Sequence, residues 1–254
     1  MSLITRKGQA KHAQENPTPE STIVLDIYRR LYEALRPQGW WPAETRFEVM
    51  VGVVLTQNTA WSNVEKAIGV LRRRDLLDLE AVRVTPEKVL ARHIRSSGYF
   101  NRKAQRLKAL VDFIVRTYGG ALDRMFSQKG EHLRKALLAV KGLGPESVDS
   151  ILLYAGDMPF FVVDTYTRRV FSRHGLVDAA ASYGQVQGYF MNRLPRDPAL
   201  FQEYHALIVK TAKQFCRKEA ACTQCPLGNL PGLSPYPSPK SQKNLMFDGK
   251  ARNP

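Results

Sequence analysis

The 254-residue sequence predicts an all-α protein. Apolar residues recur every three or four positions over most of the chain, which is the spacing of one face of a helix. Glycine and proline clusters separate these stretches, as they do at turns between helices. The one strand-like run, residues 160–163, is too short and isolated to form a sheet. We therefore expect about ten helices and no sheet, internal repeat or coiled-coil heptad.

The first expected helix, residues 22–36, has an apolar residue at every fourth position: Ile23, Ile27, Leu31 and Leu35. The other nine show the same helical spacing: residues 46–56, 61–74, 87–95, 101–117, 131–139, 146–156, 165–174, 183–193 and 198–215. The polar segment 1–20 is expected to be a loose leader, and the proline-rich segment 231–254 an irregular tail.

Composition limits the class of protein. Hydrophobic residues make up 44% of the chain, which is enough to bury a core and excludes wholesale disorder. There is no apolar run long enough to span a membrane or act as a signal peptide, so we expect a cytoplasmic protein, nucleoid-associated in a prokaryote. The 38 Lys and Arg residues exceed the 23 Asp and Glu residues, and the net charge of +15 favours a polyanionic partner.

A glycine turn follows the helix predicted at 131–139. Gly142 and Gly144 are separated by Leu143 and preceded by Lys141, and Pro145 stands where the next helix should begin. Two glycines allow a sharp turn, and their amides beside a helix N-terminus form a compact site for one phosphate. An ordinary glycine turn in a helical hairpin is the alternative interpretation.

Asp164 follows the apolar run and precedes the helix predicted at 165–174. Its structural role would be that of an N-cap. A capping aspartate at a helix N-terminus stays ionised, which also suits it to stabilise a cationic sugar or to align a water molecule. The N-cap role and a catalytic role are compatible.

The glycine turn and Asp164, twenty residues after Gly144, together resemble the helix-hairpin-helix–glycine/proline–aspartate (HhH-GPD) superfamily of DNA glycosylases, in its endonuclease III-like branch. The similarity runs from about residue 22 to residue 226. It implies an enzyme that flips a damaged nucleotide out of double-stranded DNA and cleaves its N-glycosidic bond.

The resemblance also implies a two-lobed all-α fold with a DNA cleft between the lobes. One lobe would be a six-helix barrel at residues 45–155, with the helix-hairpin-helix at 132–155. The other would combine residues 21–44 with residues 156–230, which include the cysteine-containing loop.

Further segments match the parts of this family that contact DNA. Gln57 lies in a segment whose glutamine fills the gap left by the flipped nucleotide, and Tyr99 lies in the loop that carries the wedge residue. Arg168, within a turn of Asp164, is a candidate neighbour of the flipped strand. Arg102 and Lys103 are candidate phosphate contacts.

One departure from the family bears on the reaction. Its bifunctional members carry a lysine two residues after the second hairpin glycine, and this amine attacks the sugar to form a Schiff base. Glu146 stands at that position here. A carboxylate forms no imine, so we expect a monofunctional enzyme that uses water, with Asp164 and Glu146 as catalytic residues and doubtful AP lyase activity.

The tryptophans suggest a substrate. Trp40, Trp41 and Trp61 resemble the aromatic residues that line the base pocket of 3-methyladenine DNA glycosylase III together with a hairpin glutamate. Alkylated purines are cationic, and an electron-rich indole attracts them. A packed aromatic core is the alternative interpretation of these residues.

All three cysteines fall within ten residues, which excludes a disulfide framework. Cys216, Cys222 and Cys225 resemble the [4Fe–4S] loop of endonuclease III, which normally has four thiolate ligands. The fourth cysteine should fall near Pro231 and is missing. A [4Fe–4S] cluster with another fourth ligand is expected; zinc or a metal-free remnant are the alternatives.

We therefore expect a monomeric, monofunctional base-excision-repair glycosylase for alkylated purines such as 3-methyladenine. Its partner would be double-stranded DNA with a damaged base or an abasic site, and no membrane. An endonuclease III-type glycosylase/AP lyase for oxidised pyrimidines and a non-catalytic helix-hairpin-helix DNA-binding protein are the alternatives.

Overall fold

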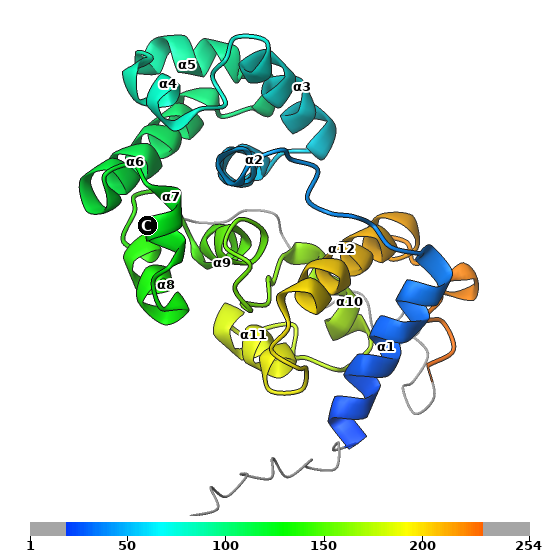
Figure 1. Ribbon diagram of the computed structural model, residues 1–254. Helices are drawn as coiled ribbons and strands as arrows, with labels where there is room; N and C mark the ends of the chain where they lie inside the picture. Colours follow the sequence, from blue (N-terminus) through cyan, green and yellow to red (C-terminus); the bar gives the residue numbers. More distant parts are fainter. Residues whose placement is uncertain (1–18, 231–254) are drawn as a thin grey trace, which may run out of the picture.

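The computed structural model describes residues 19–230 (Figure 1). Within that range the helices are α1 (Pro19–Leu35), α2 (Arg46–Thr56), α3 (Trp61–Arg72), α4 (Leu79–Val84), α5 (Glu87–His93), η1 (Arg95–Ser97), α6 (Phe100–Tyr118), α7 (Leu122–Phe126), α8 (Gly130–Leu138), α9 (Pro145–Tyr154), α10 (Thr165–Arg173), α11 (Tyr183–Met191), α12 (Pro198–Gln214) and η2 (Cys222–Gln224). The only β-type pairing among these residues is an isolated bridge between Cys216 and Ala220. The all-α prediction is confirmed.

Each of the ten predicted helices corresponds to a helix of the structure. The sequence analysis missed α4 and α7, which have six and five residues and so are too short to repeat an apolar stripe. α1 begins at Pro19, inside the expected leader, while the rest of the leader and the expected tail lie outside the described residues. No described helix combines the length and the hydropathy that crossing a bilayer requires.

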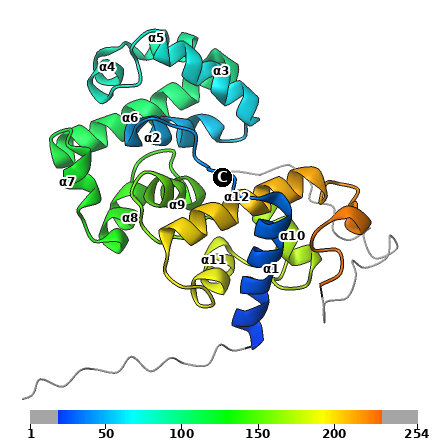
Figure 2. The same ribbon diagram turned by 45° about the vertical axis from the view of Figure 1, so that its right-hand side comes forward.

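The helices form two lobes (Figures 1 and 2). Helices α2 to α8 make one lobe, in which α6 packs against α2, α4, α5 and α7. In the other lobe α12 packs against α1 and α10. α9 lies between them and contacts α2, α8 and α12, so it joins the two halves. The predicted lobe boundaries stay a prediction, because α9 packs mainly against α2 and α8 but also against α12.

Several helices of both lobes begin at a side chain that caps their first turn. Thr45 accepts a hydrogen bond from the Glu48 amide at the start of α2. Ser182 and Gln185 form a reciprocal capping box at the start of α11. Such caps satisfy amides that have no partner inside the helix. The same local rule places Asp164 at the start of α10.

Residues 160–163 form a buried extended segment rather than a strand. Its backbone is held by side chains of α11: the Gln187 amide donates to the Phe161 carbonyl at 2.8 Å, and the Val163 amide lies 3.4 Å from the Tyr183 hydroxyl. Gln187 also donates to the buried carboxylate of Asp149, which Arg134 binds through two hydrogen bonds of 2.6 and 2.9 Å. This network connects α8, α9 and α11 to the segment that leads into Asp164.

Candidate active site

Asp164 lies at the N-terminus of α10, where it caps the first turn. Its Oδ1 accepts a 2.7 Å hydrogen bond from the Thr167 amide, and its Oδ2 lies 3.6 Å from Nε2 of His205 on α12. The side chain is 13% exposed. Burial raises the pKa of Asp164, but His205 and the Thr167 amide outweigh burial and hold the pKa below its ordinary value. Asp164 is therefore an ionised carboxylate at neutral pH.

Glu146 lies on the first turn of α9, directly after Pro145. It is accessible to solvent yet crowded by protein atoms, as a group in a concavity is. Burial and the negative charge of Asp164 raise its pKa to about 7, while His205 and Arg168 act in the opposite direction. Two neighbouring carboxyl groups with separated pKa values are typical of sites that divide acid, base and electrostatic roles between them.

The three tryptophans form one cluster, as the sequence analysis expected. The ring centroids of Trp40 and Trp61 are 4.5 Å apart, those of Trp40 and Trp41 5.3 Å, and those of Trp41 and Trp61 5.4 Å. Gly52 on α2 makes room for the cluster, because a Cβ there would lie only 3.0 Å from the Trp41 indole. All three rings are partly exposed, so the cluster offers aromatic surface at the junction of the lobes.

Tyr154 connects this cluster to Asp164. Its ring lies 5.4 Å from that of Trp41, and its hydroxyl is 2.7 Å from Nδ1 of His205. A continuous row of contacts therefore runs from the tryptophans through Tyr154 and His205 to the carboxylate.

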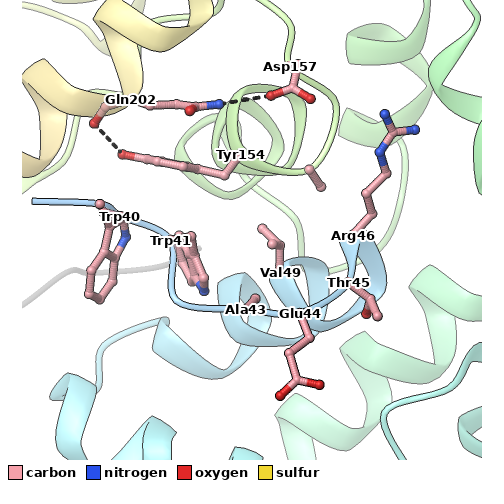
Figure 3. Close-up of a pocket in the computed structure, with 12 residues that line it drawn as sticks. Trp40, Trp41, Ala43, Glu44, Thr45, Arg46, Val49, Tyr154, Asp157 and Gln202 are labelled. Carbon is pink, nitrogen blue, oxygen red and sulfur yellow. Dashed lines mark hydrogen bonds between the residues drawn. The ribbon is translucent and has the colours of Figure 1, made fainter.

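A cavity of about 340 Å³ lies beside Trp40, Trp41 and Tyr154 (Figure 3). Its lining comes from the segment before α2, the start of α2, the end of α9 and Gln202 of α12. Neither Asp164 nor Glu146 lines it. Glu146 is at the opposite end of α9, so this hollow is distinct from the carboxylate pair.

The hairpin turn between α8 and α9 contacts side chains from the end of α2 and from α6. Gly142 has a φ of +89°, and a Cβ there would overlap the Arg106 side chain, so both the turn and the close packing require glycine. The side-chain amide of Gln57 donates to the Gly142 carbonyl at 3.2 Å and to the Ser147 hydroxyl at 2.8 Å. Arg106 in turn donates to the side-chain oxygen of Gln57. Space around Gly144 is open. Of the other hairpin residues that the sequence analysis named, Lys141 is exposed and Leu143 is buried.

Tyr99 stands at the start of α6 with 67% of its surface exposed and a left-handed backbone, φ +44°. Such a conformation is uncommon for a bulky residue and persists only where the surrounding structure holds it. Lys103, one turn further along α6, is fully buried. Its ammonium group donates to three oxygens of the protein, so the expectation that it contacts phosphate is wrong. Arg102 beside it is exposed.

The cysteine-containing loop is held by Arg173 of α10, which donates to the Cys216 sulfur at 3.2 Å and to the Arg217 carbonyl at 2.6 Å. Cys222 is exposed, and burial raises the pKa of the Cys225 thiol. Among residues 19–230, no three His, Cys, Asp or Glu side chains are arranged to hold a metal ion. The thiols have the right chemistry for a cluster, and Cys216 and Cys222 both contribute to the raised pKa of Cys225. The [4Fe–4S] cluster stays a prediction from the resemblance, and we derive no step of the reaction through it.

The sequence matches the family of HhH-GPD superfamily base excision DNA repair proteins over residues 51–196. The chain belongs to this family. MJ1434 of Methanocaldococcus jannaschii, named as a candidate DNA repair glycosylase, is 46% identical over 81% of this chain and 94% of its own. The crystal structure of the H. pylori 3-methyladenine DNA glycosylase MagIII bound to 1,N6-ethenoadenine is similar at 27% identity, with a TM-score of 0.67 over 76% of this chain and 97% of that one. The structure of a trapped endonuclease III–DNA covalent intermediate is 20% identical and shares the fold. Its TM-score is 0.70, over 82% of this chain and 93% of that one.

The structure adds two residues to the site of this HhH-GPD protein that sequence reasoning did not assign to it. The sequence analysis named neither His205 nor Tyr154 as a site residue. Their contacts join positions 41 and 51 residues apart, and no local pattern signals such pairs. Arg168, a predicted DNA contact, donates to the Ala181 carbonyl and affects the pKa of Glu146.

Proposed function

We propose that this base-excision-repair glycosylase is monofunctional and removes alkylated purines such as 3-methyladenine from double-stranded DNA. The observation that carries the proposal is the pair formed by Asp164 and Glu146. An ionised aspartate lies near enough to a second carboxyl group to raise its pKa, and that second group stands at the position where bifunctional relatives carry an amine.

Lyase chemistry needs a free amine within reach of the sugar. The charged groups that act on the pKa of Glu146 are Asp164, His205 and Arg168, none of which is a lysine. Lys103 is fully buried and its amine is committed to three acceptors. These placements support hydrolysis by water.

The reaction follows from the charge of the substrate. When the C1′–N bond of a cationic alkylpurine nucleotide breaks, its electron pair moves to the base, which leaves neutral, and the sugar becomes an oxocarbenium ion. The Asp164 carboxylate, anchored by the Thr167 amide, stabilises that cation. Water then adds to C1′ and releases one proton, which leaves an abasic site.

Two features favour a cationic purine. The partly exposed indoles of Trp40, Trp41 and Trp61 can attract a cationic ring through their faces. Glu146, ionised above a pKa of about 7, adds negative charge beside Asp164. The similarity to MagIII, a 3-methyladenine glycosylase, supports the same substrate class.

The remaining residues of the predicted interface suit a DNA duplex. Gly144, before the first turn of α9, leaves space for a phosphate beside a helix N-terminus, and Lys141 is exposed next to it. The exposed ring of Tyr99 is suited to wedge between bases, while Gln57 lies against the hairpin. We propose that the protein acts as a monomer.

The test is a single-turnover reaction on labelled duplexes containing 3-methyladenine or thymine glycol, each analysed with and without alkali. Strand breaks only after alkali, and only in the methylated duplex, are expected. Asp164→Asn should keep binding and lose base release. Breaks without alkali on thymine glycol, or a borohydride-trapped complex on abasic DNA, would refute the proposal.

A further inference from the structure

His205 occupies an unusual position for a buried histidine. The residue is 8% exposed, and its Nε2 is shielded from solvent with no hydrogen-bond partner among the described residues. Oδ2 of Asp164 lies 3.6 Å from Nε2. An unpaired buried N–H is costly enough that most proteins avoid it, so this one needs an explanation.

The hydrogen bond at Nδ1 determines which ring nitrogen of His205 carries the proton. Nδ1 lies 2.7 Å from the Tyr154 hydroxyl, which also lies 3.2 Å from the Gln202 carbonyl (Figure 3). That carbonyl is inside α12, where it already accepts a hydrogen bond from the helix backbone. The tyrosine proton therefore goes to Nδ1 by the shorter contact, and the imidazole proton is on Nε2, facing Asp164.

The gap of 3.6 Å is slightly too long for a hydrogen bond. Catalytic hydrogen bonds are often long in free enzymes and shorten when substrate is bound. Oδ1 of Asp164 is already fixed by the Thr167 amide at 2.7 Å, so a donor on Oδ2 would fix the remaining freedom of the carboxylate.

We propose that His205 is a positioning residue, which donates from Nε2 to Asp164 when the flipped nucleotide is bound and thereby holds the carboxylate against the sugar, with Tyr154 setting the tautomer. This inference rests on the proposed function. Tyr154 then has two roles: its ring contacts Trp41 in the aromatic cluster, and its hydroxyl orients His205.

Several charged groups surround this row. The charge of Asp164 raises the pKa of Glu146 on α9, and the charge of Arg168 on α10 lowers it. Glu203 on α12 acts on Tyr154. Because His205 is the chief cause that lowers the pKa of Asp164, its removal raises the pKa of that carboxyl. The acidic limb that Asp164 sets in the pH–rate profile then moves to higher pH, while the step near pH 7 that belongs to Glu146 is a separate feature of the profile.

The experiment measures single-turnover release of labelled base from DNA methylated with a tritiated reagent, from pH 3.5 to pH 8, together with binding to an abasic-analogue duplex; the range reaches the acidic limb that Asp164 sets and keeps it apart from the Glu146 step near pH 7. His205→Ala is expected to slow release tenfold to a hundredfold, the range of one lost hydrogen bond to a charged group, and to shift the acidic limb upward. His205→Gln, whose amide places a donor near Nε2, should recover most of the rate and restore the limb. Binding should stay within about twofold of wild type, because neither change touches the DNA-contacting residues.

Two further variants keep the test decisive. Tyr154→Phe retains the ring and removes only the hydroxyl, and it should slow release less than His205→Ala. His132→Gln, an exposed histidine on α8, is the matched control and should behave as wild type. If His205→Ala and Tyr154→Phe release base at the wild-type rate with an unmoved acidic limb while Asp164→Asn is inactive, the positioning role is wrong. If wild-type protein releases no base, the proposed function fails and this inference falls with it.

Discussion

Replacing Lys103 by methionine is expected to lower the free energy of unfolding by about 3 kcal/mol at pH 7. The ammonium group donates to the Leu55 carbonyl at 2.7 Å, to the Thr59 hydroxyl at 2.8 Å and to the Ser97 carbonyl at 2.6 Å. Methionine has a similar length and no donor, so the Leu55 carbonyl and the Thr59 hydroxyl would lose the ammonium donor, while the Ser97 carbonyl would keep the Thr59 hydroxyl as a donor. Each unpaired acceptor costs about 1–3 kcal/mol, and relief from burying a charge offsets part of that total.

The effect of replacing Lys103 on stability also depends on pH. Burial lowers the pKa of Lys103 from 10.5 to about 8. Between pH 8 and 10.5 the unfolded chain therefore binds more protons at this site than the folded protein, and the stability of wild type gains about 3 kcal/mol from this group as pH rises through that window. Lys103→Met lacks the gain, so the difference between the two proteins widens above pH 8.

Urea unfolding followed by circular dichroism at pH 7, 8, 9 and 10 measures both effects. Lys108→Met is the matched control, because Lys108 lies on the same helix but is only half-buried and donates to two carbonyls. It should lose about 1 kcal/mol at most. A Lys103→Met protein within about 0.5 kcal/mol of wild type, with an unchanged pH slope, would refute the reasoning.

Lys103 also has a functional consequence, because the Ser97 carbonyl it binds immediately precedes Gly98 and Tyr99, and Thr59 follows the Gln57 segment. Loosening this contact should impair base release from duplex DNA more than from single-stranded DNA, in which no wedge is needed. An equal loss on both substrates would mean that Lys103 supports the fold without positioning the wedge.

Three further predictions follow. For Glu146, whose pKa is raised to about 7, ionisation as pH rises through 7 should accelerate release of a cationic base; Glu146→Gln should remove that step from the single-turnover pH profile, and its persistence would assign the step to another group. Asp149→Ala leaves the Arg134 guanidinium without its buried carboxylate and should destabilise the protein by about 3–5 kcal/mol, so an unchanged melting temperature would contradict the network. The family resemblance predicts iron in the purified protein, although the thiols of residues 19–230 are not arranged as a metal site; colourless, iron-free, active protein would exclude the cluster.

Local signals were enough to predict ten helices, the hairpin turn and the capping position of Asp164. Each depends on residues within about one or two turns of each other: the 3.6-residue period, a glycine at positive φ, a proline at the first helical position, a side chain that bonds an amide three residues on. Trp40, Trp41 and Trp61 were predicted as base-pocket residues from the family resemblance and not from a physical rule.

Contacts between distant positions needed the tertiary structure. His205 reaches Asp164 across 41 residues, and Lys103 reaches the Leu55 carbonyl across 48, so no periodicity or spacing distinguishes either from an ordinary helical residue. The same local pattern of basic residues made Arg102 and Lys103 look alike, yet the packing of α6 leaves one exposed and encloses the other. Sequence by itself determined which segments are helical and which residues begin them, because those choices are made by near neighbours; which side chains share a buried site was decided by how the two lobes pack on α9.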